Sequence, residues 1–491
     1  MNLKDLLPLL TITQVWGNTD VEFFDIGVDS RVVKAGDLFV AIKGEVVDAN
    51  QYVGDVVGKG AVVILSQLPL PESMKDWNGV WVQVDDDRKA LSFVAEAFFD
   101  FPSSKIKLVG VTGTNGKSTV VSLLYQLFTD LGYKVGLFST IENRIYNKVL
   151  PSKLTTPDPI SLSRYLAEMV EVGCDFAFME VSSHALSQQR CAALQFEGGV
   201  FMNISHDHLD YHQTFQNYIY AKKIFFDQLS ASAFALVNMD DSRSPIMLQN
   251  CKAKKASFGL QRIVDYKVQI LEEDINAMLL SINQQQFYTS IAGRFNAYNL
   301  AAVYGVADLM GMESSEVLRL ISNLQGVKGR LQKVKVGDQL PIGVVDYAHT
   351  PDAVEKVCQA LNAMLTNDGR LLVVVGCGGD RDKTKRPIMA RIAASNSSIC
   401  ILTSDNPRTE SPEDILLEMA EGLNPVLKAK TFSIVNRKEA IRMAVAMANV
   451  NDVILVAGKG HENYQIIGNE VLPFDDAEIL TYALQNKYIK A

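Results

Sequence analysis

The chain has 491 residues, of which 48% are hydrophobic and 21% charged, enough to form several hydrophobic cores, and typical domain sizes predict about three units. Its formal charge of −9 comes from 56 acidic and 47 basic residues without any run of Lys or Arg, which excludes the basic stripe of a nucleic-acid-binding protein. No segment approaches the roughly 20 apolar residues of a membrane span, and Asp5 and Pro8 interrupt the apolar stretch that a signal peptide needs. We therefore expect a cytoplasmic protein that binds neither nucleic acid nor a membrane.

Apolar runs of strand length recur along the chain, each followed by a Gly-rich or polar turn. This order, continued by segments of helical periodicity, is typical of parallel sheets covered by helices, so the sequence predicts an α/β fold. Ligands of such sheets bind beyond the carboxyl ends of the strands. The runs lie at residues 107–111, 176–181, 199–204, 371–375, 399–403 and 453–457. These six runs exceed the number that a single sheet needs.

Two breaks in the pattern suggest domain boundaries. The segment Phe101-Pro102-Ser103-Ser104 precedes a fresh strand, and glycines at 326 and 329 precede a charged, alternating stretch. We expect an N-terminal domain over 1–98, a central domain over 99–330 and a C-terminal domain over 331–491. The six cysteines are scattered and none has CxxC spacing, so we interpret them as reduced core residues.

A glycine loop follows the strand predicted at 107–111, and an apolar helical stripe at 120, 121, 124, 127 and 128 follows the loop. In such a loop, backbone N–H groups and the helix N-terminus point at phosphate oxygens, a lysine adds positive charge and a serine binds Mg²⁺. The alternative is a Gly-rich turn with a surface lysine, but strand, loop and helix occur in the required order. The predicted nucleotide-binding residues are Gly113, Thr114, Asn115, Gly116, Lys117, Ser118 and Thr119.

The six histidines fall into four short windows, each just beyond a predicted strand: His184; His206, His208 and His212; His349; His461. Glu180 ends the strand before His184, and a carboxylate there suits Mg²⁺ between phosphates; the alternative is a half-buried structural Glu. The cluster at 206–212 has enough histidines for zinc, but no cysteine completes a structural zinc set, so Mg²⁺ is favoured.

Lys222 and Lys223 lie in a stretch of helical periodicity at 218–226. From periodicity alone, we expect either lysine to be a solvated helix residue. Nothing in the local pattern indicates that Lys222, and not Lys223, has a functional role.

Together, the segments 113–118, 180–184, 207–210 and 218–222 resemble the central domain of the Mur ligase family, in order and in spacing. The resemblance continues through 295–299, 346–351, 376–382, 385–387, 405–408 and 458–462, and so covers almost the whole chain. It implies three domains: a small α/β domain that holds a UDP group, a central phosphate-loop ATPase-like domain, and a Rossmann-like domain that holds an incoming amino acid.

The resemblance also implies roles for individual residues. Lys222 would be carbamylated and would join Ser118, Glu180 and His208 around Mg²⁺, with Lys117, Glu180, His208 and Lys222 forming the catalytic set. Further ATP contacts would come from Asn299, Arg330, Asp346 and His349. In the UDP-muropeptide, uridine would contact Val28, Ser30, Glu45, Val46 and Val47, and the muropeptide would contact Thr155, Thr156, Ser182, Gln188 and Arg190. Leu154 stands where the family often has Asn. The amino-acid site would comprise Arg386, Asp405, Asn406, Pro407, Arg408, Gly458 and Glu462.

The turn at 405–408 would set amino-acid specificity. Pro407 stiffens the turn, and the planar guanidinium of Arg408 suits a bidentate bond to a carboxylate. The distal end of meso-diaminopimelate carries a carboxylate and an ammonium, whereas lysine lacks the carboxylate and would leave Arg408 unpaired. Taken alone, Asp-Asn-Pro is also an ordinary turn sequence.

The resemblance implies a monomeric, ATP-dependent acid–amino-acid ligase of peptidoglycan synthesis, and hence a role in cell shape and division. It would join meso-diaminopimelate to UDP-MurNAc-L-Ala-D-Glu with ATP and Mg²⁺, and its domains would close to bring the substrates together. Two alternatives remain: a similar ligase that adds lysine, or glutamate to folate, and a phosphate-loop switch or transport ATPase that needs no amine acceptor.

Overall fold

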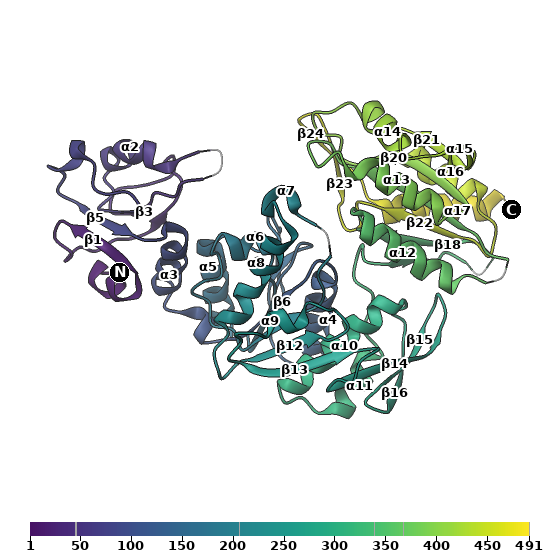
Figure 1. Cartoon of the computed structure of the whole chain (residues 1–491), viewed down its shortest axis with the longest axis horizontal. Coiled ribbons are helices and arrows are strands. Elements are labelled where there is room, and N and C mark those ends of the chain that lie inside the picture. The colour runs from purple at the N-terminus through teal and green to yellow at the C-terminus, as the bar shows by residue number, and fades with distance from the viewer. Residues whose placement is uncertain (45–46, 206, 338, 367, 491) are drawn as a thin grey trace.

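The computed structural model describes residues 1–44, 47–205, 207–337, 339–366 and 368–490. Three lobes, each built around its own sheet, follow one another along the chain (Figure 1). The main sheets draw their strands from residues 12–84, 107–289 and 332–457, and on that basis we propose domain limits near 98 and 330.

The N-terminal lobe contains a small, mostly parallel sheet with the strand order β1-β5-β4-β3-β2, in which β1 alone among the described strands is antiparallel to its neighbour. Its strands are β1 (Ile12–Trp16), β2 (Ile26–Gly27), β3 (Leu38–Val40), β4 (Val63–Ser66) and β5 (Val80–Val84), and its helices are α1 (Leu3–Leu6), α2 (Val53–Gly58) and α3 (Asp87–Phe98), with 3-10 turns at Leu7–Leu9, Ala49–Tyr52 and Glu72–Met74.

The central lobe is built on a long sheet with the order β16-β15-β14-β13-β12-β11-β6-β10-β7-β8-β9. Its strands are β6 (Lys107–Thr112), β7 (Val135–Phe138), β8 (Asn143–Ile145), β9 (Lys148–Leu150), β10 (Phe176–Glu180), β11 (Gly198–Phe201), β12 (Phe234–Asn238), β13 (Lys254–Gly259), β14 (Tyr266–Glu273), β15 (Met278–Ile282) and β16 (Gln285–Thr289). Its helices are α4 (Lys117–Asp130), α5 (Pro159–Glu171), α6 (Ser183–Ser187), α7 (Leu209–His212), α8 (Phe215–Gln228), α9 (Ser244–Met247), α10 (Arg294–Leu309) and α11 (Ser314–Ile321), and a 3-10 turn covers Pro102–Ser104.

Strand β6 lies between β10 and β11, and all three run parallel. The segments that follow them therefore meet at one edge of the sheet. The predicted stripe on α4 is confirmed, since Val120, Val121, Leu124, Leu127 and Phe128 are fully buried. Strand β11 ends at Phe201, earlier than the predicted residue 204, because the chain turns there to pair with the glycine loop: Thr114 N donates to the Asn203 carbonyl oxygen (2.9 Å).

The C-terminal lobe holds a sheet with the order β17-β18-β22-β19-β20-β21, parallel apart from β17 in the portion of the chain described, and a separate hairpin of β23 and β24. Its strands are β17 (Gln332–Val334), β18 (Ile342–Asp346), β19 (Leu371–Cys377), β20 (Ile399–Ser404), β21 (Thr431–Ile434), β22 (Val453–Ala457), β23 (Tyr464–Ile467) and β24 (Glu470–Pro473), and its helices are α12 (Pro351–Met364), α13 (Lys385–Ser395), α14 (Pro412–Ala420), α15 (Pro425–Lys428), α16 (Arg437–Met447) and α17 (Asp476–Lys490).

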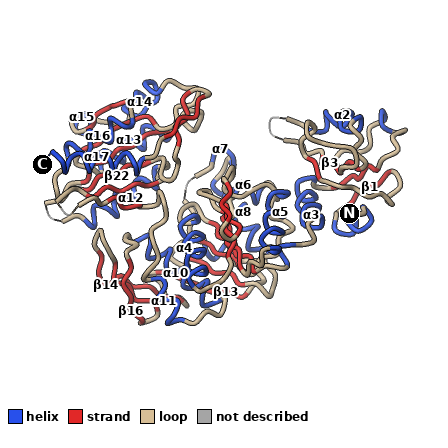
Figure 2. The backbone as a smooth tube through the Cα atoms, turned by 180° about the vertical axis from the view of Figure 1, so that it is seen from behind, coloured by secondary structure: helices blue, strands red, loops and turns tan. Residues whose placement is uncertain are grey.

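Helices cover both faces of this third sheet, and each face has its own apolar core. Figure 2 shows the same three lobes from behind, with α3 and α5 side by side at the first junction. There the buried Glu96 of α3 accepts hydrogen bonds from Ser103 (2.8 Å) and from Ser163 of α5 (3.2 Å). The fold is α/β, as predicted, and all six cysteines are free and buried.

None of the helices in the described ranges is long and apolar enough to cross a lipid bilayer.

Candidate functional site

The glycine loop at 113–116 connects β6 to α4, as the sequence predicts. Gly116 precedes α4 with φ +90°, and a Cβ atom there would lie 2.7 Å from Asn299 Oδ1, so only glycine fits. The side chain of Asn203 holds the loop from the β11 side, because its Oδ1 accepts from Asn115 N (2.9 Å) and its Nδ2 donates to the Asn115 carbonyl oxygen (3.1 Å). This gives a fixed loop that leads into a helix N-terminus, which is a suitable site for phosphate groups.

Two lysines from distant parts of the chain donate to the same carbonyl oxygen of this loop. Lys117 Nζ lies 2.9 Å and Lys222 Nζ 3.0 Å from Gly113 O. Burial lowers the pKa of Lys117, against the opposing charges of Glu180 and Asp207. The pKa of Lys222 lies well below its ordinary value, because the side chain is buried and because Lys117 is a nearby cation.

The burial of the lysines contradicts what periodicity predicts. Lys222 and Lys223 are only 1% and 4% exposed. Lys223 Nζ pairs with Asp227 at 2.6 Å, and Lys222 points at the loop. Lys222 is covered by the glycine loop, to which it donates, and a pattern within one helix gives no information about the neighbouring segments that cover it.

Glu180 ends β10 and lies in register with Val111 of β6. It is 1% exposed, and Thr140 donates to it through the backbone N–H (2.6 Å) and the hydroxyl group (3.2 Å). Thr140 Oγ1 also contacts Thr155 Oγ1 at 3.1 Å. The predicted carboxylate is therefore fixed next to the loop, at the edge where the residues predicted for the muropeptide begin.

Most of the residues predicted for the muropeptide form one hydrogen-bonded group. Thr156 Oγ1 donates to the Glu180 carbonyl oxygen (2.7 Å) and accepts from Ser182 N (3.1 Å). Arg190 Nη1 donates to the Thr156 carbonyl oxygen (2.8 Å), and Arg190 Nη2 donates to Gln188 Oε1 (2.6 Å). These segments are separated in sequence but adjoin Glu180 in space.

The residues predicted for uridine lie in the N-terminal lobe. Val28 and Ser30 follow β2, and Val47 lies beyond β3, which pairs with β2 in parallel. Val28 and Val47 are 40% and 54% exposed. Glu45 and Val46 lie outside the described residues, as does His206.

His208 lies between β11 and α7 with φ +53°. Its ring is 4.8 Å from that of His184 and 6.0 Å from that of Tyr218, measured between centroids. Partial burial lowers the pKa of His208 to about 4, although Asp207, 3.6 Å away, favours the protonated form. His208 is therefore a neutral ring at physiological pH, with one nitrogen lone pair available to a metal ion.

The donor atoms around the loop suit Mg²⁺, which prefers oxygen ligands and takes one or two carboxylates together with phosphate oxygens. The buried hydroxyl group of Ser118 lies in the first turn of α4, which follows β6, and the carboxylate of Glu180 ends the neighbouring strand β10. In the described part of the chain, no group of three or more His, Cys, Asp and Glu side chains is arranged to hold a metal ion.

The junction between the second and third lobes contacts the start of α4 directly. Arg330 Nη2 donates to Ser118 Oγ (3.0 Å), and the guanidinium lies 4.7 Å from the centre of the Tyr347 ring. Asp346 at the end of β18 accepts from Leu331 N (2.7 Å), and burial raises its pKa. His349 Nδ1 donates to the Tyr347 carbonyl oxygen (2.9 Å).

The predicted amino-acid site lies at the carboxyl ends of β20 and β22. Asn406 Nδ2 donates to Glu462 Oε2 (2.9 Å), and a Cβ atom on Gly458 would lie 2.6 Å from Asp405 Oδ2. Arg408 adopts φ +53°, and its Nη1 donates to the Gly379 carbonyl oxygen (2.7 Å). The structure thus brings the residues of 405–408 and 458–462 together.

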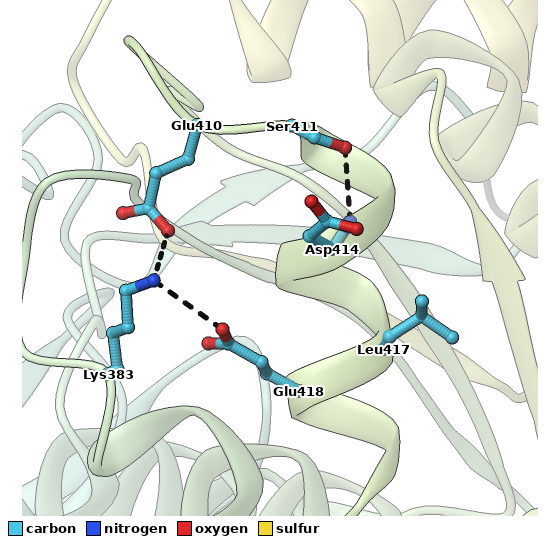
Figure 3. Close-up of a pocket in the computed structure, with 6 residues that line it drawn as sticks. All are labelled: Lys383, Glu410, Ser411, Asp414, Leu417 and Glu418. Atoms are coloured by element: carbon cyan, nitrogen blue, oxygen red, sulfur yellow. Dashed lines mark hydrogen bonds and ion pairs between the residues drawn. The ribbon is translucent and has the colours of Figure 1, made fainter.

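Arg386 is the member of this set that is fully buried, and two carboxylates already pair with it. Its guanidinium bonds to Glu410 (2.9 Å) and to Glu418 (2.6 Å). Figure 3 shows that Lys383 also interacts with both of these carboxylates, and the three side chains line a cavity of about 380 Å³. The residues that line this cavity, Lys383, Glu410, Ser411, Asp414, Leu417 and Glu418, are not among those predicted for any ligand.

Two residues at the site were missed by sequence reasoning. Asp352 Oδ2, at the start of α12, accepts from Asn115 Nδ2 (3.1 Å) and Ser205 Oγ (2.9 Å), and so joins the nucleotide loop to the third lobe. An acidic residue in the first turn of a helix is ordinary, so no local signal marks it. Lys459 lies within the segment 458–462 that carries the family resemblance and is fully buried beside Asn406. Its place between two glycines is the sequence feature that could have indicated its role.

Comparisons with known proteins agree with this arrangement. Residues 111–307 match the Mur ligase middle domain, and residues 329–460 match the Mur ligase, glutamate ligase domain. The chain is 47% identical over 481 residues to the UDP-N-acetylmuramoyl-L-alanyl-D-glutamate--2,6-diaminopimelate ligase of Cytophaga hutchinsonii, covering 98% of each chain.

Solved structures show the same similarity. A structure of a UDP-N-acetylmuramoyl-L-alanyl-D-glutamate--2,6-diaminopimelate ligase superposes with a TM-score of 0.70 at 30% identity and covers 99% of both chains. The MurF ligase of Thermotoga maritima in complex with ADP superposes with a TM-score of 0.61 at 16% identity, over 95% of this chain and 98% of that one. At that identity the second match shows a shared fold.

Proposed function

The chain belongs to the Mur ligase family, and on that premise we propose that it joins 2,6-diaminopimelate to UDP-N-acetylmuramoyl-L-alanyl-D-glutamate in an ATP-dependent reaction of peptidoglycan synthesis. The observation that carries this proposal is that Asp352 of α12 accepts hydrogen bonds from Asn115 Nδ2 (3.1 Å) and Ser205 Oγ (2.9 Å), which tie the lobe bearing Arg408 to the nucleotide loop. A nucleotide site and an amino-acid site on two touching lobes are what a ligase of this type requires.

The reaction has two steps. An oxygen of the D-Glu side-chain carboxylate attacks the γ-phosphorus of ATP, the bond to the β,γ-bridging oxygen breaks, and ADP leaves with the electron pair. The amine of diaminopimelate then attacks the acyl carbon of the resulting acyl phosphate, and phosphate leaves as the amine loses its proton. Lys117 offsets negative charge that develops on the phosphate, and Thr155, Thr156 and Arg190 orient the carboxylate substrate.

Magnesium, held by Ser118, Glu180 and His208, would neutralise phosphate charge when bound. We propose that Lys222 supports it after carbamylation. Formation of a carbamate requires a neutral amine, whose nitrogen bonds to the carbon of CO₂ with loss of a proton. Complete burial and the proximity of Lys117 favour the neutral form of Lys222.

We propose that the meso isomer is the substrate and that Arg408 binds its distal carboxylate. The turn supports this role, because the guanidinium of Arg408 lies against the loop at 378–379 while Asp405 and Glu462 supply negative charge nearby. We further propose that the enzyme acts in the cytoplasm, where ATP and nucleotide-linked precursors are made, and as a monomer, which size-exclusion chromatography tests.

A phosphate-release assay tests the function. Purified protein is given ATP, Mg²⁺ and UDP-N-acetylmuramoyl-L-alanyl-D-glutamate, and each of a panel of amino acids is then added. We expect phosphate release to depend on both the UDP substrate and meso-diaminopimelate. Release stimulated instead by lysine, or by glutamate with folate, would indicate another ligase, and release without any amine acceptor would indicate a switch or transport ATPase.

A further inference from the structure

Lys459 lies just beyond β22, in the segment between Gly458 and Gly460, and its side chain is fully buried. The ammonium donates to Asn406 Oδ1 (2.7 Å) and to the Tyr464 carbonyl oxygen (2.8 Å). It also lies 3.9 Å from Asp405 Oδ1 and 3.7 Å from Glu462 Oε2. One cation thus contacts or faces three of the residues assigned to the amino-acid site.

The contact with Asn406 fixes the orientation of that side-chain amide. Asn406 Oδ1 accepts from Lys459 Nζ and from Ile466 N (3.0 Å), so its NH₂ group must face the other way. There it donates to Glu462 Oε2 (2.9 Å). The chain of bonds from Lys459 through Asn406 sets the position of the Glu462 carboxylate.

The charges of this group match one end of the substrate. Asp405 and Glu462 contribute two negative charges and Lys459 one positive charge, which leaves one negative charge for a single ammonium group. Arg408 provides a positive charge for a carboxylate on the neighbouring turn. Without Lys459, two buried carboxylates would face each other, and repulsion would favour protonation of one of them.

We propose that Lys459 is a positioning residue for the amino-acid substrate: it holds Asn406 and Glu462, and balances Asp405, so that the pocket accepts the distal ammonium of an amino acid that also carries a distal carboxylate. This inference rests on the proposed function and adds to it a residue that sets specificity without contacting the reacting atoms.

The pKa of Glu462 depends on the charge of Lys459, so a pH profile can test the proposed role of Lys459 specifically. Burial and then Asp405 raise the pKa of Glu462, whereas Lys459, Asn406 and Arg408 lower it. Tyr347, Tyr464 and Arg437 are the other titratable groups that it influences. Removal of the Lys459 charge should raise the pKa of Glu462 further, so that the carboxylate is lost at a higher pH.

The test compares Lys459→Met with Arg370→Met in the full-length enzyme. Arg370 and Asp452 form an ion pair (2.7 Å) and immediately precede β19 and β22, respectively. The control therefore removes one cation from an ion pair at the opposite end of the sheet from Lys459. For Lys459→Met we expect the KM for meso-diaminopimelate to rise at least about tenfold, because a buried charged hydrogen-bond partner is lost. We expect the KM for ATP to change less than about twofold. The rise in the KM for diaminopimelate at acid pH should begin at a higher pH than in the wild type.

The control should leave the KM for diaminopimelate and its pH profile unchanged while lowering thermal stability. Unchanged diaminopimelate kinetics in Lys459→Met, or equal increases in the KM of ATP and of diaminopimelate without a shift in pH profile, would overturn the proposal. If the methionine variant does not fold, Lys459→Gln, which keeps a hydrogen-bond donor but no charge, is compared in the same way. Failure of the wild-type enzyme to form product would instead overturn the proposed function.

Discussion

At the scale of single residues, the unusual feature is a pair of lysines directed at one carbonyl oxygen. Lys117 and Lys222 both donate to Gly113 O, yet they come from helices α4 and α8. Two cations this close disfavour each other's charge, and burial adds to that effect. The two side chains therefore suit different tasks: Lys117 at the phosphates, and Lys222 as a neutral amine open to carbamylation.

Lys222→Ala tests this division of roles. We expect the rate of phosphate release to fall on the order of 100-fold, as when a supporting group of a metal site is removed. The matched control is Lys223→Ala, which removes the adjacent buried lysine and its pair with Asp227 but no contact to the loop, and should retain most activity. Full activity in Lys222→Ala, or a bare ammonium in high-resolution density, would contradict the carbamate hypothesis.

Arg408→Ala tests recognition of the distal carboxylate. We expect the KM for meso-diaminopimelate to rise on the order of 100-fold, with ATP binding almost unchanged, because the carboxylate loses a charged partner. The preference for diaminopimelate over lysine should fall in parallel. Arg381→Ala, which removes an exposed arginine from the neighbouring loop at 378–382, is the control. Equal losses for ATP and diaminopimelate would point to misfolding instead.

At the scale of elements, Glu410 connects the turn at 405–408 to α13. It accepts from both terminal nitrogens of Arg386 (2.9 Å each), from Asp380 N (2.6 Å) and from Lys383 Nζ (3.0 Å). These bonds, the one from Arg386 first among them, lower the pKa of Glu410 from 4.5 to about 2. The position of Arg408 therefore depends on a carboxylate two residues further along the chain.

Glu410→Gln should destabilise the protein in a pH-dependent way. Because the pKa of Glu410 is lower in the folded state, its contribution to stability is complete above pH 4.5 and is lost as the pH falls towards about 2. At pH 7 we expect a loss of about 1 kcal/mol, or a decrease of about 2–4 °C in the melting temperature of the C-terminal domain. Melting curves between pH 3 and 7 should show the difference from wild type shrinking with acidity; a constant difference would contradict this assignment.

At the scale of the whole molecule, two joints connect the three lobes. Glu96 with Ser103 and Ser163 forms the first, and Ser118 with Arg330 and Asn115 with Asp352 form the second. The second joint includes polar contacts to the glycine loop and to the first turn of α4, where the phosphates of ATP would bind, so a bound nucleotide would compete for some of them. We therefore expect domain motion during the reaction cycle.

Small-angle X-ray scattering tests this motion. Adding a non-hydrolysable ATP analogue and the UDP substrate should change the scattering curve of the wild-type enzyme, whereas Lys117→Ala, which loses its phosphate contact, should respond less. Identical curves with and without ligands would argue against domain closure, as would crystal structures that superpose in a single arrangement.

Features that are encoded within one segment of the chain could be predicted from the sequence. The strand, loop and helix around 107–130, the carboxylate at the end of the 176–180 strand and the α/β class all depend on neighbouring residues, and the structure confirms them. Periodicity could not show that Lys222 is buried, because its covering atoms belong to a loop 109 positions away. Asp352 and Lys459 likewise gained their roles through contacts with Asn115 and Asn406, 237 and 53 positions distant. Only tertiary packing brings such groups together, since the order of the strands in a sheet is set by topology and not by local pattern.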